Sequence, residues 1–216
     1  MGLYEYWPLY SVVLSSKLIS LRIVNDEDLE SLVKRAREGI HDPETMPFGN
    51  PWTDLKTPEL ERSLLKTIWR ERAESNPKSW RVSFSVIFDG DIIGLQSLSA
   101  DDFSITRVVT THSWLSQKFQ NRGLGTEMRA IVLEFAFRGL KANEARSDSY
   151  LDNIASIKVS QKLGYVENGL KVWPRRNEPV TSQIFSIYKE SWQKRSRDDI
   201  SIQGIEDFTT FFEIAM

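Results

Sequence analysis

The run from Gln120 to Thr126 contains residue types that can hold a ligand through the backbone. It reads Gln-Asn-Arg-Gly-Leu-Gly-Thr, follows a β-branched stretch and precedes apolar residues at helical spacing. Gly123 and Gly125 would let this turn approach a ligand without Cβ interference. The N–H groups of the first helical turn then point outward together, and the helix dipole favours an anion beside them.

We predict that this run binds a phosphate group. Arg122 and the hydroxyl of Thr126 would add donors to the backbone N–H groups. Two glycines are also typical of an ordinary turn or helix cap, so the residues around them must decide between the two interpretations.

The sequence around this run resembles the motifs of a known family. Gln-x-x-Gly-x-Gly, behind a Trp-Leu pair and ahead of an amphipathic helix, is similar to the acetyl-CoA loop of the GNAT acyltransferases. A second block, Asp-Asn-Ile-Ala-Ser at 152–156 and Lys-Leu-Gly-Tyr at 162–165, resembles the family's next motif at the expected distance. Two ordered blocks are far more specific than one. The resemblance covers about residues 18–188 and is nearest to the RimJ/RimL-type acetyltransferases, which modify N-terminal amines of ribosomal proteins.

The resemblance implies acetyl-CoA as a co-substrate. Main-chain groups of one strand would contact the pantetheine arm, and a backbone N–H there would stabilise the oxyanion. Asn153 would also bind pantetheine, although Asp152 and Asn153 are equally typical helix caps. The residues implied to contact acetyl-CoA are Trp114, Leu115, Gln120, Asn121, Arg122, Gly123, Leu124, Gly125, Thr126, Asn153 and Ser156.

Two residues are candidates for catalysis. Many GNAT enzymes place a Tyr seven residues after the Asn of the second block, where this chain has Ser160. The RimJ/RimL-like branch places a Ser three residues after it, so Ser156 is implied as the donor to the departing sulfur, with a simple helix cap as the alternative. His112 occupies the neighbourhood in which family members often carry a Glu base. A lone His in a strand is more often a packed side chain, so the identity of the base stays open.

The segment 41–54 is the most unusual loop of the chain. Its three prolines hold it extended, and its carboxylates stand beside aromatic side chains. We expect Asp42, Glu44 and Trp52 to bind an amine acceptor. An equally open alternative is a rigid surface crossover whose aromatic side chains cover the core.

Hydrophobic periodicity predicts the elements that must position these residues. The predicted strands are 18–23, 80–88, 92–95, 105–115, 145–150, 165–173 with a turn at 168–169, and 180–188, and the predicted helices are 29–38, 57–73, 124–137 and 153–163. Asp89-Gly90 is a hairpin turn within an antiparallel meander, and Gly94 indicates a bulge or close packing. The charged loop 174–179 would rim the substrate mouth, contact a subunit or simply be solvated.

Together with the resemblance, these elements imply an α/β (α+β type) GNAT fold. Its mixed, mostly antiparallel sheet would be splayed at the acetyl-CoA site, with helices on both faces. We expect an N-terminal arm over 1–16, the acetyltransferase domain over 17–190 and a C-terminal extension over 191–216. The aromatic arm and the amphipathic tail would pack on the domain or on another copy, which leaves a homodimer open.

Composition sets limits on the function. The 216 residues are 40% hydrophobic and 27% charged, as in an ordinary soluble globular protein. With no Cys and two His, neither a disulfide framework nor a metal site is expected. A net charge of -2 provides no basic field for nucleic acid. The apolar runs are too short to cross a bilayer and residues 1–20 lack a secretory signal, so we expect a cytoplasmic protein.

The predicted reaction is direct transfer of acetyl from CoA to a primary amine, with a peptide N-terminus as the acceptor. A small amine, such as a polyamine or an aminoglycoside, is the alternative acceptor, and a CoA-binding module without catalysis is a second alternative. A phosphate-binding kinase or nucleotidase is disfavoured. The chain has no Gly-x-x-x-x-Gly-Lys-Ser/Thr loop, and its glycine turn follows an antiparallel meander.

Overall fold

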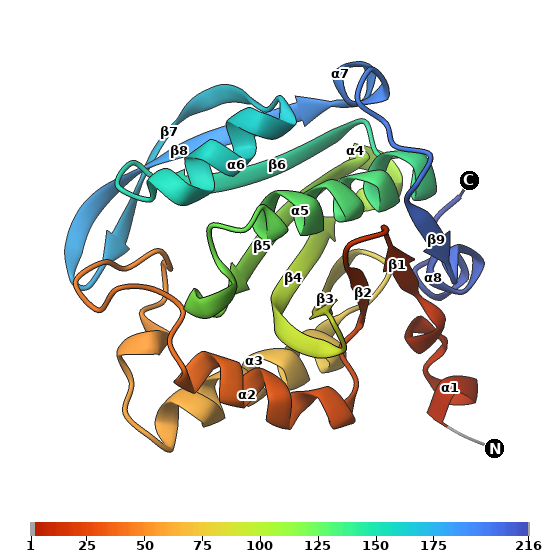
Figure 1. Cartoon of the computed structure of the whole chain (residues 1–216). Coiled ribbons are helices and arrows are strands. Elements are labelled where there is room, and N and C mark those ends of the chain that lie inside the picture. Colours follow the sequence, from red (N-terminus) through yellow and green to blue (C-terminus); the bar gives the residue numbers. More distant parts are fainter. Residues whose placement is uncertain (1–2, 216) are drawn as a thin grey trace.

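A nine-stranded sheet forms the centre of the computed structural model, which describes residues 3–215 (Figure 1). Its strands lie in the order β7-β8-β6-β5-β4-β3-β2-β1-β9. Every neighbouring pair is antiparallel except β5 and β6, which are parallel, so the predicted mixed, mostly antiparallel sheet is confirmed. The strands are β1 Val13–Ser15, β2 Ser20–Ile23, β3 Ser79–Phe88, β4 Asp91–Asp101, β5 Val108–Leu115, β6 Glu144–Tyr150, β7 Val166–Arg175, β8 Glu178–Tyr188 and β9 Ser201–Gln203.

Helices cover both faces of this sheet, as predicted. The helices are α1 Leu3–Tyr6, α2 Leu29–Arg37, α3 Glu59–Glu74, α4 Phe103–Thr106, α5 Leu124–Glu134, α6 Ile154–Leu163, α7 Lys189–Gln193 and α8 Ile205–Phe211. A smaller apolar cluster joins α2 and α3 to Leu95 and Trp114. The larger cluster joins α5 to the other face of the strands, with side chains such as Phe84 and Ile131 at its centre. A π-helical turn, Phe135–Gly139, continues α5.

The sheet opens between its two parallel strands. β5 and β6 pair over only three residues each, Val108 to Thr110 with Glu144 to Arg146. Beyond this point β5 stays paired with β4 as far as Leu115, and β6 stays paired with β8 as far as Tyr150. The two halves of the sheet therefore diverge and leave a wedge-shaped gap, which confirms the predicted splay.

The meander that leads to the gap follows the predicted local rules. Asp89 and Gly90 have φ of 55° and 81°, as a tight hairpin turn between β3 and β4 requires. A Cβ added at Gly94 would lie 2.2 Å from the carbonyl oxygen of Trp114, and the β3–β4 register shifts between Val86 and Ile87 opposite it. Both parts of the Gly94 prediction, a bulge and close packing, are confirmed, because only glycine lets β4 lie this close to the end of β5.

Two predicted strands have different bounds. The strand expected over 92–95 runs on to Asp101 as β4. The strand expected over 105–115 begins only at Val108, and the prediction was wrong for its first residues. Phe103 enters the core and starts the short helix α4, which Arg107 closes with a φ of 52° and a backbone bond to the Phe103 carbonyl. Burial of Phe103 therefore overrides the β-branched pattern.

The predicted turn at 168–169 is also wrong. Both residues lie in the continuous strand β7, at a bulge where the pairing with β8 shifts between Glu167 and Leu170. The loop predicted over 174–179 is shorter than expected. Arg176 and Asn177 form a tight turn with φ of 51° and 67°, and the neighbouring residues belong to β7 and β8.

Both ends of the described chain pack on the same sheet. β9 pairs with β1, so a strand from each end completes one edge of the sheet (Figure 1). The aromatic side chains of Phe208 and Phe212 are buried against Trp80, with ring centroids 5.4 Å from it. Of the two outcomes expected for the tail, packing on its own domain is observed. Within residues 3–215, no helix is both long and apolar enough to span a bilayer.

Candidate functional site

The turn 120–126 lies beside the open end of the gap and has the geometry of an anion-binding helix start. Asn121 and Gly123 have φ of 58° and 79°, and α5 begins directly after them. The Gly123 carbonyl accepts the N–H groups of Thr126 and Glu127 at 3.1 and 3.0 Å. The N–H groups of Leu124 and Gly125 are the earliest in the helix, and such groups have no intrahelical acceptor. They can therefore bind an anion together.

The space around this turn fits a phosphate. A Cβ added at Gly125 would lie 3.8 Å from a methyl group of Leu115 and 3.9 Å from one of Val159, which is ordinary van der Waals contact. A Cβ at Gly123 would meet nothing within 4 Å, and only its backbone conformation favours glycine. The protein itself does not demand a glycine at position 125, which is compatible with the close approach of a ligand.

Two side chains of the turn have partners in the protein. The amide of Gln120 donates to the carbonyl of Ile40 at 2.6 Å and to that of Leu115 at 2.8 Å. The guanidinium of Arg122 lies over the ring of Phe88, 5.1 Å from its centroid. Gln120 therefore ties the turn both to the end of β5 and to the segment that follows α2.

The second block forms the start of α6, which packs against α5. The side chain of Asn153 caps this helix by accepting the N–H of Ser156 at 3.2 Å, and Gly164 closes it with a φ of 86°. Ser156 contributes its backbone to this cap, whereas the capping oxygen belongs to Asn153. The hydroxyl of Ser156, which is half-buried in the first turn of α6, is therefore not the group that caps the helix.

The opposite face of the gap carries a different set of side chains. Alternate residues of a strand point to the same face, so His112 shares a face with Trp114, which packs under α2 and α3. On β6, Ser147 bonds to α5, which places Asp148 and Tyr150 on the face of His112. His112 and Asp148 are both exposed and interact electrostatically across the gap.

The surroundings of His112 favour its neutral form. The protein around the ring lowers its pKa below the ordinary value, although the side chain keeps contact with solvent. The carboxylate of Asp148 acts in the other direction and raises the pKa, whereas Arg81 and Arg129 lower it. A neutral imidazole that faces solvent can accept a proton from a bound amine.

A row of polar groups adjoins His112 on the same face. His112 stands opposite Ser97 in the β4–β5 register, and the hydroxyl of Ser97 lies 2.9 Å from that of Ser83. Ser83 donates to the carboxylate of Glu71 on α3 at 2.6 Å, and burial raises the pKa of Glu71. The floor of this face is thus polar beside His112 and ends in a carboxyl group.

The segment 41–54 forms the wall of this face. Its aromatic rings form a continuous row from His41 through Phe48 and Trp52 to Trp114, with successive centroids 5.6 to 6.2 Å apart. Trp52 is therefore part of the packing under the wall. The carboxylate of Asp42 accepts the N–H of Glu44 at 2.9 Å, and both acidic side chains are exposed.

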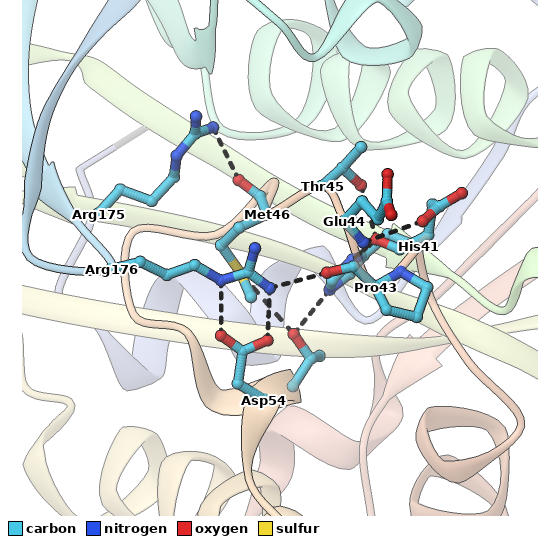
Figure 2. Close-up of polar contacts among 10 residues, drawn as sticks. His41, Pro43, Glu44, Thr45, Met46, Asp54, Arg175 and Arg176 are labelled. Atoms are coloured by element: carbon cyan, nitrogen blue, oxygen red, sulfur yellow. Dashed lines mark hydrogen bonds and ion pairs between the residues drawn. The ribbon is translucent and has the colours of Figure 1, made fainter.

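Two arginines from the β7–β8 hairpin hold this segment in place (Figure 2). Arg176 forms a bidentate ion pair with Asp54, with both distances 2.7 Å, and donates to the carbonyl of Pro43 at 3.0 Å. Arg175 donates to the carbonyl of Met46 at 3.0 Å, pairs with Asp152 at 2.6 Å and stacks over Tyr150. We call these contacts the arginine latch.

Sequence reasoning missed several residues that the structure brings to the gap. Asp148 could have been found, because alternation in β6 places it opposite the core-facing side chains. The loop 174–179 was expected to rim the substrate mouth, to contact a subunit or to be solvated. The contacts of Arg175 and Arg176 with the segment 41–54, more than 100 positions away, follow from no local pattern. Among residues 3–215, no group of three or more His, Cys, Asp or Glu side chains is placed to hold a metal ion.

Comparison with known proteins identifies relatives of the chain. A family model described as an acetyltransferase (GNAT) domain matches residues 19–166. A protein of Bacillus subtilis strain 168, YdaF, whose name assigns it provisionally to ribosomal N-acetyltransferases, is 23% identical over 117 residues. That alignment covers 52% of this chain and 62% of YdaF.

Solved structures share the fold at low sequence identity. RimL, described as a ribosomal-protein alpha-N-acetyltransferase in complex with coenzyme A, is similar with a TM-score of 0.65 at 14% identity, over 82% of this chain and 97% of its own. A chimera of the spermidine N-acetyltransferase SpeG from Vibrio cholerae is similar with a TM-score of 0.64 at 15% identity, over 83% of this chain and 100% of its own. At this identity the likeness establishes the fold alone.

Proposed function

The chain belongs to the GNAT acetyltransferase family, and from this premise we propose that it transfers acetyl from acetyl-CoA to the N-terminal amine of a protein or peptide. The family match includes both sequence blocks, which confirms the resemblance seen in them. One observation carries the proposal: the β5–β6 gap has a glycine turn and the start of α5 on one face, and His112 with Asp148 on the other.

The CoA half of the proposal rests on the turn and on the open edge of β5. The pyrophosphate would bind at the start of α5, on the N–H groups of Leu124 and Gly125. Beyond Thr110, β5 has no β6 partner, so one edge of its backbone is available to pantetheine. Pantetheine that lies along Leu115 and Trp114 would occupy the place of a missing strand and direct the thioester into the gap.

The chemistry needs a base on one face and a stabilised leaving group on the other. The amine nitrogen attacks the thioester carbon, so a C–N bond forms while the C–S bond breaks. His112, kept neutral by its surroundings, takes the proton that the nitrogen loses. The Ser156 hydroxyl donates a hydrogen bond to the departing sulfur. Because the thioester is already activated, the chain needs mainly to align the two reactants.

The ion pairs at the mouth reduce the number of carboxylates that a polyamine could use. A polycation needs several carboxylates that can turn towards it, but Asp54 and Asp152 are engaged by the arginine latch. The exposed carboxylates of Asp42 and Glu44 would suit a single ammonium group. The names of YdaF and RimL support the same acceptor class, and a cytoplasmic reaction is part of this proposal.

The test compares matched acceptors. The purified chain is incubated with acetyl-CoA and peptides that differ in their first residues, each as a free amine and as the N-formylated form of the same sequence. We expect CoA release and a mass increase of one acetyl group only with free N-termini. A higher kcat/KM for spermidine than for every peptide would identify a small-amine enzyme. Tight CoA binding without acetylation of any amine would identify a binding module.

A further inference from the structure

Arg129 is a buried cation that faces no carboxylate. Its side chain extends from α5 towards the sheet and is only 4% exposed. The guanidinium donates to the hydroxyl of Ser147 at 3.0 Å and to that of Ser113 at 3.1 Å. Among the residues that the structure describes, its hydrogen-bond partners are these two serines and no acidic side chain, and its Nε has no acceptor. Buried charges are normally paired, so this arrangement needs a reason.

The guanidinium lies at the closed end of the β5–β6 gap, where the pairing of the two strands stops; we call this point the apex. Ser147 directly follows the last β6 residue that pairs with β5, and Ser113 is three residues beyond the last paired residue of β5. One side chain therefore bridges the two strands where their ladder ends. Position 129 lies beside Met128 on the sheet-facing surface of α5, where an apolar residue would pack without any charge to compensate.

The groups around Arg129 do not neutralise it. The hydroxyl of Tyr165 is buried beside Arg129 and Thr111. Burial raises its pKa, although its interactions with these two residues lower it, so the phenol stays neutral. His112 on β5 and Arg81 on β3 lie on the other face, and Arg129 helps to lower the pKa of His112. Asp148 on β6 is exposed on that same opposite face and interacts with His112. The apex therefore keeps a positive field on the α5 side.

The position of this field matches one charge of the reaction. Pantetheine that enters at the turn 120–126 and runs along β5 from Leu115 towards Thr110 has its thiol as the end nearest the apex. When the C–S bond breaks, the electron pair stays on sulfur. We propose that Arg129 stabilises the developing thiolate of CoA, an inference that rests on the proposed acyl transfer from CoA. No proton moves to or from the guanidinium, which acts by its fixed charge.

The competing account is a purely structural strut that holds the two strands at a fixed separation. Two substitutions separate charge from hydrogen bonding. Arg129→Gln removes the charge but keeps an amide that can bond a serine hydroxyl, whereas Arg129→Lys keeps the charge without the planar fork. A Ser113→Ala/Ser147→Ala double variant removes both bonds and leaves the charge in place.

The experiment measures the thiol pKa of CoA bound to each variant, from the ultraviolet absorbance of the thiolate across a pH series. Calorimetry first establishes that CoA binds, and melting curves establish that each variant folds. We expect Arg129→Gln to raise the thiol pKa of bound CoA by about one unit, a tenfold lower thiolate fraction, while Arg129→Lys and the double serine variant stay near the parent. We also expect kcat to fall by about ten- to a hundredfold in Arg129→Gln with little change in KM.

The outcomes separate this inference from the proposed function. An unchanged thiol pKa in folded, CoA-binding Arg129→Gln would overturn the role of the charge. If the double serine variant raises the thiol pKa and lowers kcat as much as Arg129→Gln does, the role of Arg129 is purely structural. Failure of the parent chain to bind CoA would instead overturn the proposed function and this inference with it. If Arg129→Gln does not fold, Arg129→Met removes the charge together with both bonds, and its comparison with the double serine variant, which lacks only the bonds, isolates the effect of the charge.

Discussion

The two segments that flank the gap are held in opposite ways. The turn 120–126 is shaped mainly by its own backbone, through left-handed residues at Asn121 and Gly123 and the helix that follows. The segment 41–54 contains no helix longer than one turn and is held by side chains from the distant β7–β8 hairpin. The first arrangement suits a ligand of fixed chemistry. The second arrangement would let the proposed acceptor wall change with little effect on the turn.

The largest expected effect comes from a substitution in the turn 120–126 that leaves the segment 41–54 unchanged. Gly125→Glu places bulk and negative charge where the phosphate would approach the start of α5, so CoA binding should be lost in calorimetry. Gly125→Ala is the control, because its Cβ meets only ordinary contacts at 3.8 and 3.9 Å and the fold accepts it. Unchanged CoA affinity in a folded Gly125→Glu variant would mean that the turn is only structural.

The next effect concerns proton transfer on the acceptor face. His112→Gln keeps a polar side chain of similar reach but cannot act as the base, so kcat should fall by about a hundred- to ten-thousandfold. Acetyl-CoA affinity should stay near the parent value, because His112 lies on the face opposite the turn. Retention of the parent kcat would exclude His112 as the base and leave the row from Ser97 to Glu71 to be tested in its place.

The pH profile sharpens this prediction. A His base works only when neutral, and the surroundings of His112 lower its pKa. The rate should therefore persist below the pH at which an ordinary histidine would become protonated, and should fall only as pH drops through the lowered pKa. Because Asp148 raises that pKa, Asp148→Asn should move the acidic limb of kcat/KM to still lower pH. A shift to higher pH would contradict the arrangement across the gap.

The comparison also explains what the sequence could predict. The turn, the two blocks and the meander follow local rules, since glycine positions, hairpin turns and periodicity act over a few residues. Gly94 and the Asp89-Gly90 turn were therefore placed correctly. The start of β5 was misplaced because the burial of Phe103, a long-range contact, decided it.

The contacts that hold the segment 41–54 could not be predicted for the same reason. The pairing of Arg176 with Asp54 spans 122 positions, and nothing near either residue indicates the other. Arg129 is hidden in a different way. It lies between the buried residues Met128 and Ala130 of α5, and periodicity alone gives a charged residue there no function. Its contacts with Ser113 on β5 and Ser147 on β6 become visible only in the folded structure, where the pairing of these strands ends.

A smaller effect is expected at the start of α6. Ser156→Ala removes the proposed donor to sulfur, so kcat should fall by about ten- to a thousandfold with acetyl-CoA binding nearly intact. Since Asn153 provides the capping oxygen, the melting temperature of Asn153→Ala shows what loss of the cap alone costs, about 1 kcal/mol of stability. If Ser156→Ala melts earlier but reacts at the parent rate, Ser156 is structural.

The smallest effect tests whether the acceptor wall works through its charges or through its shape. Asp54→Asn breaks the exposed ion pair with Arg176 and should loosen the segment 41–54, so the KM of the peptide amine should rise by about two- to fivefold, as exposed ion pairs contribute little. Asp42→Asn and Glu44→Gln remove the same charge without touching the latch. If the shape of the segment 41–54 determines acceptor binding, Asp42→Asn and Glu44→Gln should raise the acceptor KM less than Asp54→Asn does. Equal rises would show that the segment acts through its charges. The acetyl-CoA constant should not move in any of them, because the turn 120–126 is shaped by its own backbone and is tied by Gln120 to Ile40 and Leu115, outside the segment 41–54. A parallel loss of acetyl-CoA affinity would show that the two segments are coupled.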